Sequence, residues 1–172
     1  MNQPEPIIAY DRPGLICLIR NQFQLDWHGI HGANHWARVL YHGKKIGRIR
    51  GADLLVVELF GFLHDSCRLS EGRDLKHGER AAEFAHGVNG EFFKLSSSQL
   101  DQLCYALRHH SGGEVSIDTS IQTCWDADRL DLGRVGVLPS SLYLSQEATS
   151  FINLATFWSE KISLSRQSSP IK

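Results

Sequence analysis

An adjacent histidine and aspartate, His64-Asp65, are the first residues whose types could do chemistry. They close an apolar run over residues 54–63. Burying such a pair without a partner costs on the order of several kcal/mol or more. A divalent metal ion is one suitable partner, because neutral imidazole nitrogen and carboxylate oxygen are ligands of zinc, iron and manganese. The alternative is a helix end that emerges into solvent, where any polar pair would serve.

Two further histidines, His31 and His35, are spaced to share one face of a helix expected to end near residue 50. Side chains four residues apart on a helix can converge on one site, although such pairs also occur as ordinary surface imidazoles. His42 shares this face but lies roughly 10 Å further along the axis, at about 1.5 Å per residue. We therefore expect His42, and also His28, to be structural.

A carboxylate on the apolar face of a later helix, predicted over about residues 118–132, is the next candidate. Asp128 continues the helical stripe formed by Ile121, Cys124 and Trp125. Asp126 points roughly the other way, because two residues turn a helix by about 200°. A carboxylate on a buried stripe needs a partner, and a metal ion is a good one. Asp131, three residues further on, could lie close to the same face.

Three more histidines lie at predicted helix ends. His77 falls in the first turn of a helix over about residues 76–85. His109 and His110 close a helix that follows a capping box at Ser96. Two adjacent histidines at a helix end can be favourable cations near the helix dipole, or they can be two metal ligands. The residues alone leave both readings open.

Basic residues crowd the stretch that follows His64-Asp65, at Arg68, Arg73 and Lys76. Cations beside a metal ion suit an anionic substrate such as a phosphate. The alternative is a solvated basic loop with no functional role.

The elements that must position these residues are predicted to be helices, because few segments alternate with a period of two. The apolar run at residues 15–19 is too short to assign as helix or strand. The first expected helix starts between about residues 29 and 34 and ends near residue 50. The others cover about residues 52–65, 76–85, 97–110, 118–132 and 146–162. We therefore predict an all-α fold, a single compact helical bundle over residues 1–172, with its core at about 28–162 and a mobile tail at 163–172.

The composition narrows the class of protein. With 172 residues, 42% of them hydrophobic, the chain can form one domain with a sizeable core. A net charge of −1 gives no sign of general attraction to nucleic acid or membranes. We find no signal-peptide pattern and no apolar run approaching about 18 residues, so no membrane span is expected. The four cysteines form no C-x-x-C pair, which favours reduced thiols and a cytoplasmic location.

Taken in order, these residues resemble the HD domain superfamily of metal-dependent phosphohydrolases, whose signature is H…HD…D. The matching stretches are His35-Trp36-Ala37-Arg38-Val39, Phe62-Leu63-His64-Asp65 and Asp126-Ala127-Asp128-Arg129-Leu130-Asp131. The resemblance implies an all-α HD fold in which one divalent ion is held by His35, His64, Asp65 and Asp128.

The additional histidines are similar to those of the two-metal branch of this superfamily, which includes the HD-GYP phosphodiesterases. That resemblance implies that Asp65 bridges to a second ion held by His77, His109 and His110, and it allows His31 as a further ligand. The Gly-Tyr-Pro stretch is absent, so the resemblance implies the metal site and not cyclic di-GMP as substrate. Manganese, iron, zinc, nickel and magnesium are not distinguished by such ligands.

By this resemblance, water activated at His64-Asp65 would hydrolyse a phosphomonoester or phosphodiester of a small metabolite, such as a nucleotide. Arg68, Arg73, Lys76 and Asp131 would bind the substrate. Two alternatives remain: a diiron oxygenase of the same superfamily, and a non-catalytic module that binds a nucleotide for regulation. The sequence does not identify the substrate or the oligomeric state.

Overall fold

The computed structural model describes residues 10–167 of the chain. Helices make up the regular structure, with no strand in this range beyond an isolated bridge between Asn89 and Phe93. The prediction of an all-α fold is therefore confirmed. The α-helices are α1 (Arg12–Gln22), α2 (Ala33–Arg50), α3 (Leu54–Leu63), α4 (His77–Val88), α5 (Ser97–His109), α6 (Thr119–Leu130), α7 (Gln146–Thr149) and α8 (Ile152–Gln167).

Side-chain caps fix the starts of three of the helices that lead to candidate residues. Asp53 caps α3 and Asp118 caps α6, each accepting two backbone N–H bonds. Ser96 and Gln99 form the predicted capping box of α5. Each cap satisfies N–H groups that the first helical turn leaves without a partner. The caps therefore set where each helix begins.

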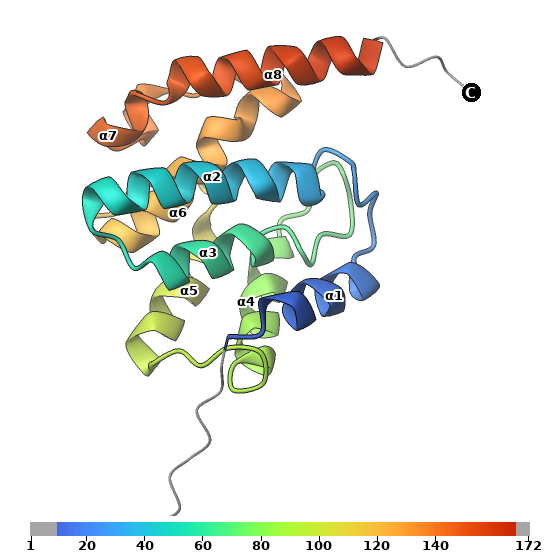
Figure 1. The fold of residues 1–172 in the computed structure, drawn as a ribbon, viewed down its shortest axis with the longest axis vertical. Coiled ribbons are helices and arrows are strands. Elements are labelled where there is room, and N and C mark those ends of the chain that lie inside the picture. Colours follow the sequence, from blue (N-terminus) through green and yellow to red (C-terminus); the bar gives the residue numbers. More distant parts are fainter. Residues whose placement is uncertain (1–9, 168–172) are drawn as a thin grey trace, which may run out of the picture.

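Helix α3 lies at the centre of the main hydrophobic core. It packs against α2, α5 and α6, and Figure 1 shows it beside α2 in the middle of the molecule. Its residues Val56, Leu59, Phe60 and Leu63 are fully buried. An apolar surface all round a helix suits this central place. The close of α3 therefore brings His64-Asp65 into the interior and not into solvent.

The N-terminal apolar run, which the sequence left unassigned, belongs to helix α1. Its residues Leu15 and Ile19 are fully buried in the main core. The carboxylate of Glu58 on α3 holds this region by ion pairs with Arg12 and Lys44 and by a 3.1 Å hydrogen bond from the Tyr10 hydroxyl. Glu58 therefore has a structural role, fixing the start of α1 and the middle of α2 against α3.

The C-terminal region departs from the prediction of one helix over about 146–162 and a mobile tail. A short α7 is followed by a separate α8, which continues to Gln167. Residues 163–167 thus belong to a helix, and residues 168–172 lie outside the described part of the chain. A second apolar cluster joins this region to α2 and α6, through Ile46, Leu130, Leu144, Ala148 and Ala155.

Two 3₁₀ helices connect α6 to α7. The first, η1 (Asp131–Val135), continues directly from α6, and the second is η2 (Ser141–Tyr143). Helix α8 packs on η1. Over residues 10–167, none of the helices has both the length and the apolar character needed to cross a membrane.

Candidate metal centre

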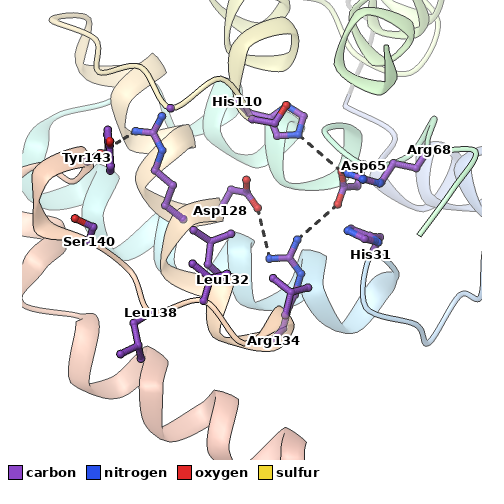
Figure 2. Close-up of a pocket in the computed structure, with 15 residues that line it drawn as sticks. His31, Asp65, Arg68, His110, Asp128, Leu132, Arg134, Leu138, Ser140 and Tyr143 are labelled. Atoms are coloured by element: carbon purple, nitrogen blue, oxygen red, sulfur yellow. Dashed lines mark hydrogen bonds and ion pairs between the residues drawn. The ribbon is translucent and has the colours of Figure 1, made fainter. Parts of the chain in front are cut away.

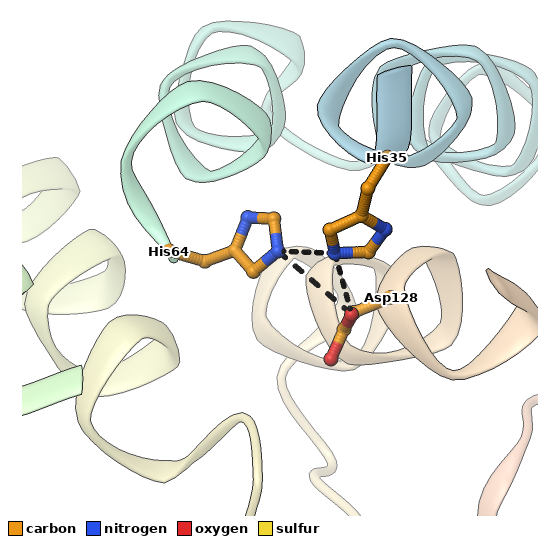
Figure 3. Close-up of side chains that lie close together, drawn as sticks. All are labelled: His35, His64 and Asp128. Carbon is orange, nitrogen blue, oxygen red and sulfur yellow. Dashed lines mark hydrogen bonds and ion pairs between the residues drawn. The ribbon is translucent and has the colours of Figure 1, made fainter. Parts of the chain in front are cut away.

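Three side chains from three elements form a first group of potential metal ligands. His35 comes from α2, His64 follows α3, and Asp128 comes from α6 (Figure 3). His35 Nε2 lies 2.9 Å from His64 Nε2 and 3.4 Å from Asp128 Oδ1. Both rings are fully buried, and Asp128 is 8% exposed. As the sequence predicts, Asp128 joins this group, whereas Asp126 binds Gln122 and Ser145 elsewhere.

The hydrogen bonds behind the two rings fix where their lone pairs point. His35 Nδ1 lies 2.7 Å from Asp131 Oδ2, and His64 Nδ1 lies 3.2 Å from the Phe60 carbonyl oxygen. In a neutral ring, a proton on Nδ1 leaves a lone pair on Nε2. With both rings neutral, the two Nε2 lone pairs would face each other, and a cation between them would satisfy both. The carboxylate behind His35 is a usual support for a metal ligand.

A second group has the same construction. His77 begins α4 and His110 follows α5, and their Nε2 atoms lie 2.8 Å apart. Behind them, His77 Nδ1 is bonded to the Asp74 carbonyl oxygen and His110 Nδ1 to the Leu107 carbonyl oxygen. The ring nitrogens that remain again face each other, so this group also fits a cation.

Asp65 lies between the two groups. Its Oδ2 is 3.5 Å from His35 Nε2 and 3.6 Å from His64 Nε2, while its Oδ1 is 3.5 Å from His77 Nε2 and 3.8 Å from His110 Nε2. Burial raises the pKa of Asp65, but the surrounding histidines outweigh this and hold it well below its usual range. Asp65 is therefore an ionised carboxylate with one oxygen directed at each group.

The pKa values within the first group differ strongly. Burial lowers the pKa of His64 to about 3, against the effect of Asp65 and Asp128. Burial and Arg134 also lower the pKa of His35, but hydrogen bonds with carboxylates, that of Asp128 foremost, raise it to about 9. A proton on His35 can therefore fill the space between the two rings, and metal binding has to displace that proton.

An arginine that the sequence analysis did not identify lies between the two carboxylates. Arg134 Nη2 is 3.9 Å from Asp65 Oδ2, and its Nη1 is 3.9 Å from Asp128 Oδ1 (Figure 2). Its Nε donates to the Ile30 carbonyl oxygen, and its side chain is 6% exposed. Its position three residues after Asp131 could have indicated that it shares a helical face with that residue. The predicted helix, however, ended at residue 132. The structure continues the turn as η1 and directs Arg134 into the site.

The structure also shows which predicted site residues lie elsewhere. His109 is half-buried and packs on the Tyr105 ring, because adjacent residues of a helix point about 100° apart. Arg73 and Lys76 are exposed. Asp131 binds His35 and Arg38 behind the site and does not line the pocket, which corrects its expected role in substrate binding.

His31 and Arg68 do reach the site. Both line the pocket, and Arg68 Nη1 lies 3.3 Å from Asp65 Oδ1. His31 Nδ1 is paired at 2.5 Å with Glu71, a partner that the sequence did not indicate. His31 belongs to neither group of potential ligands. It is therefore placed beside the centre, at the pocket wall.

A pocket of about 470 Å³ opens onto this centre (Figure 2). One end is polar and contains Asp65, Asp128, Arg68 and Arg134. The other end follows the chain after α6 and is mostly apolar. Its size is in the range of small-molecule sites in proteins.

A family model for the HD domain matches residues 32–133. The chain belongs to the HD domain family. All six potential ligands fall within the matched range. They are His35, His64, Asp65, His77, His110 and Asp128.

A solved HD structure shares this fold. The crystal structure of a "predicted HD superfamily hydrolase" from an uncultured Thermotogales bacterium has a TM-score of 0.66 and 22% sequence identity, and the match covers 91% of both chains. At this identity the similarity shows the fold alone. A comparison with curated proteins found no match.

Proposed function

We propose that this HD domain protein is a metal-dependent phosphohydrolase with two divalent ions in its centre. The observation that carries the proposal is the pairing of four imidazoles, each supported through Nδ1 and each facing another through Nε2, with Asp65 between the pairs. When bound, such ions supply Lewis-acid chemistry and activate water at neutral pH. One ion would be held by His35, His64 and Asp128, the other by His77 and His110, and Asp65 would be shared.

The chain's own residues then bind and orient the substrate. Arg68 and Arg134 both contact Asp65 and line the pocket. Their guanidinium groups are suited to phosphate oxygens, whose charge they would neutralise in the transition state. Asp131 is a positioning residue, because it fixes the ring of His35 by accepting from its Nδ1. The size of the pocket favours a small phosphorylated molecule as substrate.

The test is the metal content per chain, measured by elemental mass spectrometry on protein purified without chelator or a histidine tag. We expect about two ions per chain, as in two-metal hydrolases. The double variant His77→Ala, His110→Ala should lose about one of them. His109→Ala is the matched control, because the neighbouring ring packs on Tyr105 and should leave the metal content unchanged.

Activity is measured on the same preparations with a panel of phosphomonoesters and phosphodiesters. Turnover that is lost in both His64→Ala and Asp65→Ala, with helix content retained, supports the proposal. Full activity in either variant contradicts it. A protein that binds no metal, even after reloading with manganese, iron or zinc, would instead be a binding module.

The histidine-rich ligand set supports one other candidate function, that of a diiron oxygenase. Four imidazole ligands suit iron as well as the other divalent metals. Oxygen uptake by the iron-loaded protein, without turnover of any phosphoester, would favour this candidate. The placement of Arg68 and Arg134 at the pocket's polar end favours the phosphohydrolase, because two cations there match an anionic substrate.

A further inference from the structure

The pocket continues from the metal centre along an apolar wall that the proposed reaction does not yet use. The wall is formed by Leu132, Val135, Val137, Leu138 and Tyr143. Several of these side chains face water: Leu138 is 73% exposed, Val137 51% and Tyr143 46%. Figure 2 shows Leu132, Leu138 and Tyr143 on the opposite side of the pocket from His31 and Arg68. Exposed apolar side chains that adjoin a polar site are typical of a ligand-binding surface.

The end of the wall at Tyr143 is held by the same helix that carries Asp128. The Tyr143 carbonyl oxygen accepts hydrogen bonds from Gln122 at 3.1 Å and from Arg129 at 2.8 Å. The Ser145 hydroxyl donates to Asp126 at 2.5 Å. Because these contacts already fix the chain at Tyr143, a ligand placed against that side chain need not bear the entropy cost of ordering it.

The guanidinium of Arg129, at the apolar end of the pocket, is already hydrogen-bonded within the protein. Arg129 lines the pocket, but its Nη1 donates to the Tyr143 carbonyl oxygen and its Nη2 to the Glu114 carbonyl oxygen. Its charge is therefore used to hold the chain and not to bind a second anion. Ser111 and Ser140 also line the pocket, but their hydroxyls carry no charge to match a further phosphate.

We propose that the substrate is a phosphate ester whose leaving group is apolar and lies against this wall. This inference rests on the proposed phosphohydrolase function and names its substrate class. In hydrolysis, the water oxygen forms a new bond to phosphorus and the ester P–O bond breaks. The apolar alcohol leaves with one proton of the water, and the other proton stays with the inorganic phosphate. The wall would hold the alcohol while Arg134 and Arg68 hold the phosphoryl group.

The first arm of the test measures binding without hydrolysis. Methyl-, propyl-, butyl- and hexylphosphonate share one head group and contain no ester bond, so isothermal titration calorimetry on the manganese-loaded protein reports the contribution of the alkyl chain. We expect the dissociation constant to fall about two- to fourfold for each added methylene, the upper value corresponding to full burial. Equal affinity for methyl- and hexylphosphonate would overturn the inference.

Variants locate the effect on the wall. Leu138→Ser and Val137→Ser should each weaken hexylphosphonate binding several-fold and leave methylphosphonate binding unchanged. Both side chains are largely exposed, so folding should be retained. Leu142→Ser is the matched control, because Leu142 is 82% exposed on the same loop and does not line the pocket. An equal loss in the control would show that chain-length dependence does not come from the wall.

The second arm measures hydrolysis of methyl to hexyl phosphate, whose leaving alcohols have similar acidity. A rise of kcat/KM with chain length, reduced by Leu138→Ser, supports both the phosphohydrolase and the wall. Hydrolysis at a rate independent of chain length would contradict the proposed role of the wall, while the phosphohydrolase function would still be supported. Binding that depends on chain length, without hydrolysis of any ester, would contradict the phosphohydrolase function. It would support the wall as a binding surface for an anion with an apolar group.

Discussion

At the scale of single residues, the centre depends on the groups behind its ligands. Asp131 accepts from His35 Nδ1 and also receives two hydrogen bonds from Arg38, at 2.6 and 2.9 Å. It therefore fixes both the tautomer and the orientation of the ring. Such supporting carboxylates commonly determine the affinity of a site for its metal.

We predict that Asp131→Asn weakens metal binding about 10- to 100-fold while helix content is retained. The neutral amide lowers the basicity of His35 and loses part of the pairing with Arg38. Affinity is measured by competition with a chelator of known strength, and circular dichroism checks the fold. Glu71→Gln is the control, since Glu71 pairs with His31, which is outside both ligand groups. Unchanged metal affinity in the Asp131 variant would contradict the supporting role.

The second prediction at this scale concerns the guanidinium between the carboxylates. Arg134→Gln should lower kcat about 100-fold, the order found when a group that stabilises transition-state charge is removed. Its metal content should stay at the wild-type level, because Arg134 competes with cations and does not ligate them. Steady-state kinetics and elemental analysis measure the two quantities. Arg73→Gln, at an exposed position off the pocket, should leave both unchanged.

Residue patterns predicted much of the centre because helical periodicity is local. The apolar stripe of α6 was enough to select Asp128 over Asp126. The position of His64-Asp65 after a nearly all-apolar helix left a buried pair and a solvent-exposed helix end both open, and the other histidines favoured the buried pair. His109 and His110 could not be separated, because the choice depends on how the end of α5 packs against α4. Arg134 was missed because the chain continues past α6 as a 3₁₀ helix, and the rotation of that turn is set by packing.

At the scale of elements, the second ligand group depends on the close approach of α4 and α5. A Cβ added at Gly78 would lie only 2.3 Å from the Leu107 carbonyl oxygen, the same oxygen that supports His110. The helices can therefore approach closely only because residue 78 has no side chain. His77, next to it, is brought to His110 by this approach.

We predict that Gly78→Ala separates α4 from α5 and selectively weakens the second group. Overpacking of this kind costs about 1–3 kcal/mol of stability. The variant should lose about one metal ion per chain, as the paired histidine variant does. Gly87→Ala is the matched control on the same helix, because an added Cβ there meets nothing within 4 Å. A Gly78→Ala protein with wild-type metal content would contradict this account.

At the scale of the whole molecule, α8 is joined to the rest through an aromatic cluster around His42. The His42 ring is fully buried on α2, 5.1 Å from Trp158 and 6.1 Å from Phe151, centre to centre. Neither of its nitrogens has a hydrogen-bond partner within residues 10–167. The sequence had predicted a structural role for this histidine, and its place in the aromatic cluster, outside both ligand groups, agrees with that.

This burial predicts a dependence of stability on pH. Burial lowers the pKa of His42 to about 4, against the opposite effect of Asp131 and together with the effect of Arg38. The unfolded chain, with an ordinary value of about 6.5, therefore binds more protons than the folded chain in this interval. Stability is fully present above about pH 6.5 and falls as the pH decreases toward 4, by at most about 3 kcal/mol from this residue.

The measurement compares the thermal midpoints of the wild type and His42→Leu between pH 7 and pH 4.5. Leucine is close in size and does not titrate, so the difference between the two proteins isolates this ring. We expect the midpoint of the variant to fall less steeply with decreasing pH. Parallel curves for the two proteins would show that His42 does not contribute.

The ligand order along the chain has a consequence for biosynthesis. His35 and its supporting carboxylate Asp131 are 96 positions apart, and Asp128 is the last ligand to be translated. A growing chain therefore leaves the ribosome with histidines from α2 to α5 but without the carboxylate that completes the first group. Such a nascent chain already contains all three members of the second group, but only His35 and His64 of the first. If the two groups hold metal ions as proposed, the second can be assembled before the first, which has to wait until α6 has docked.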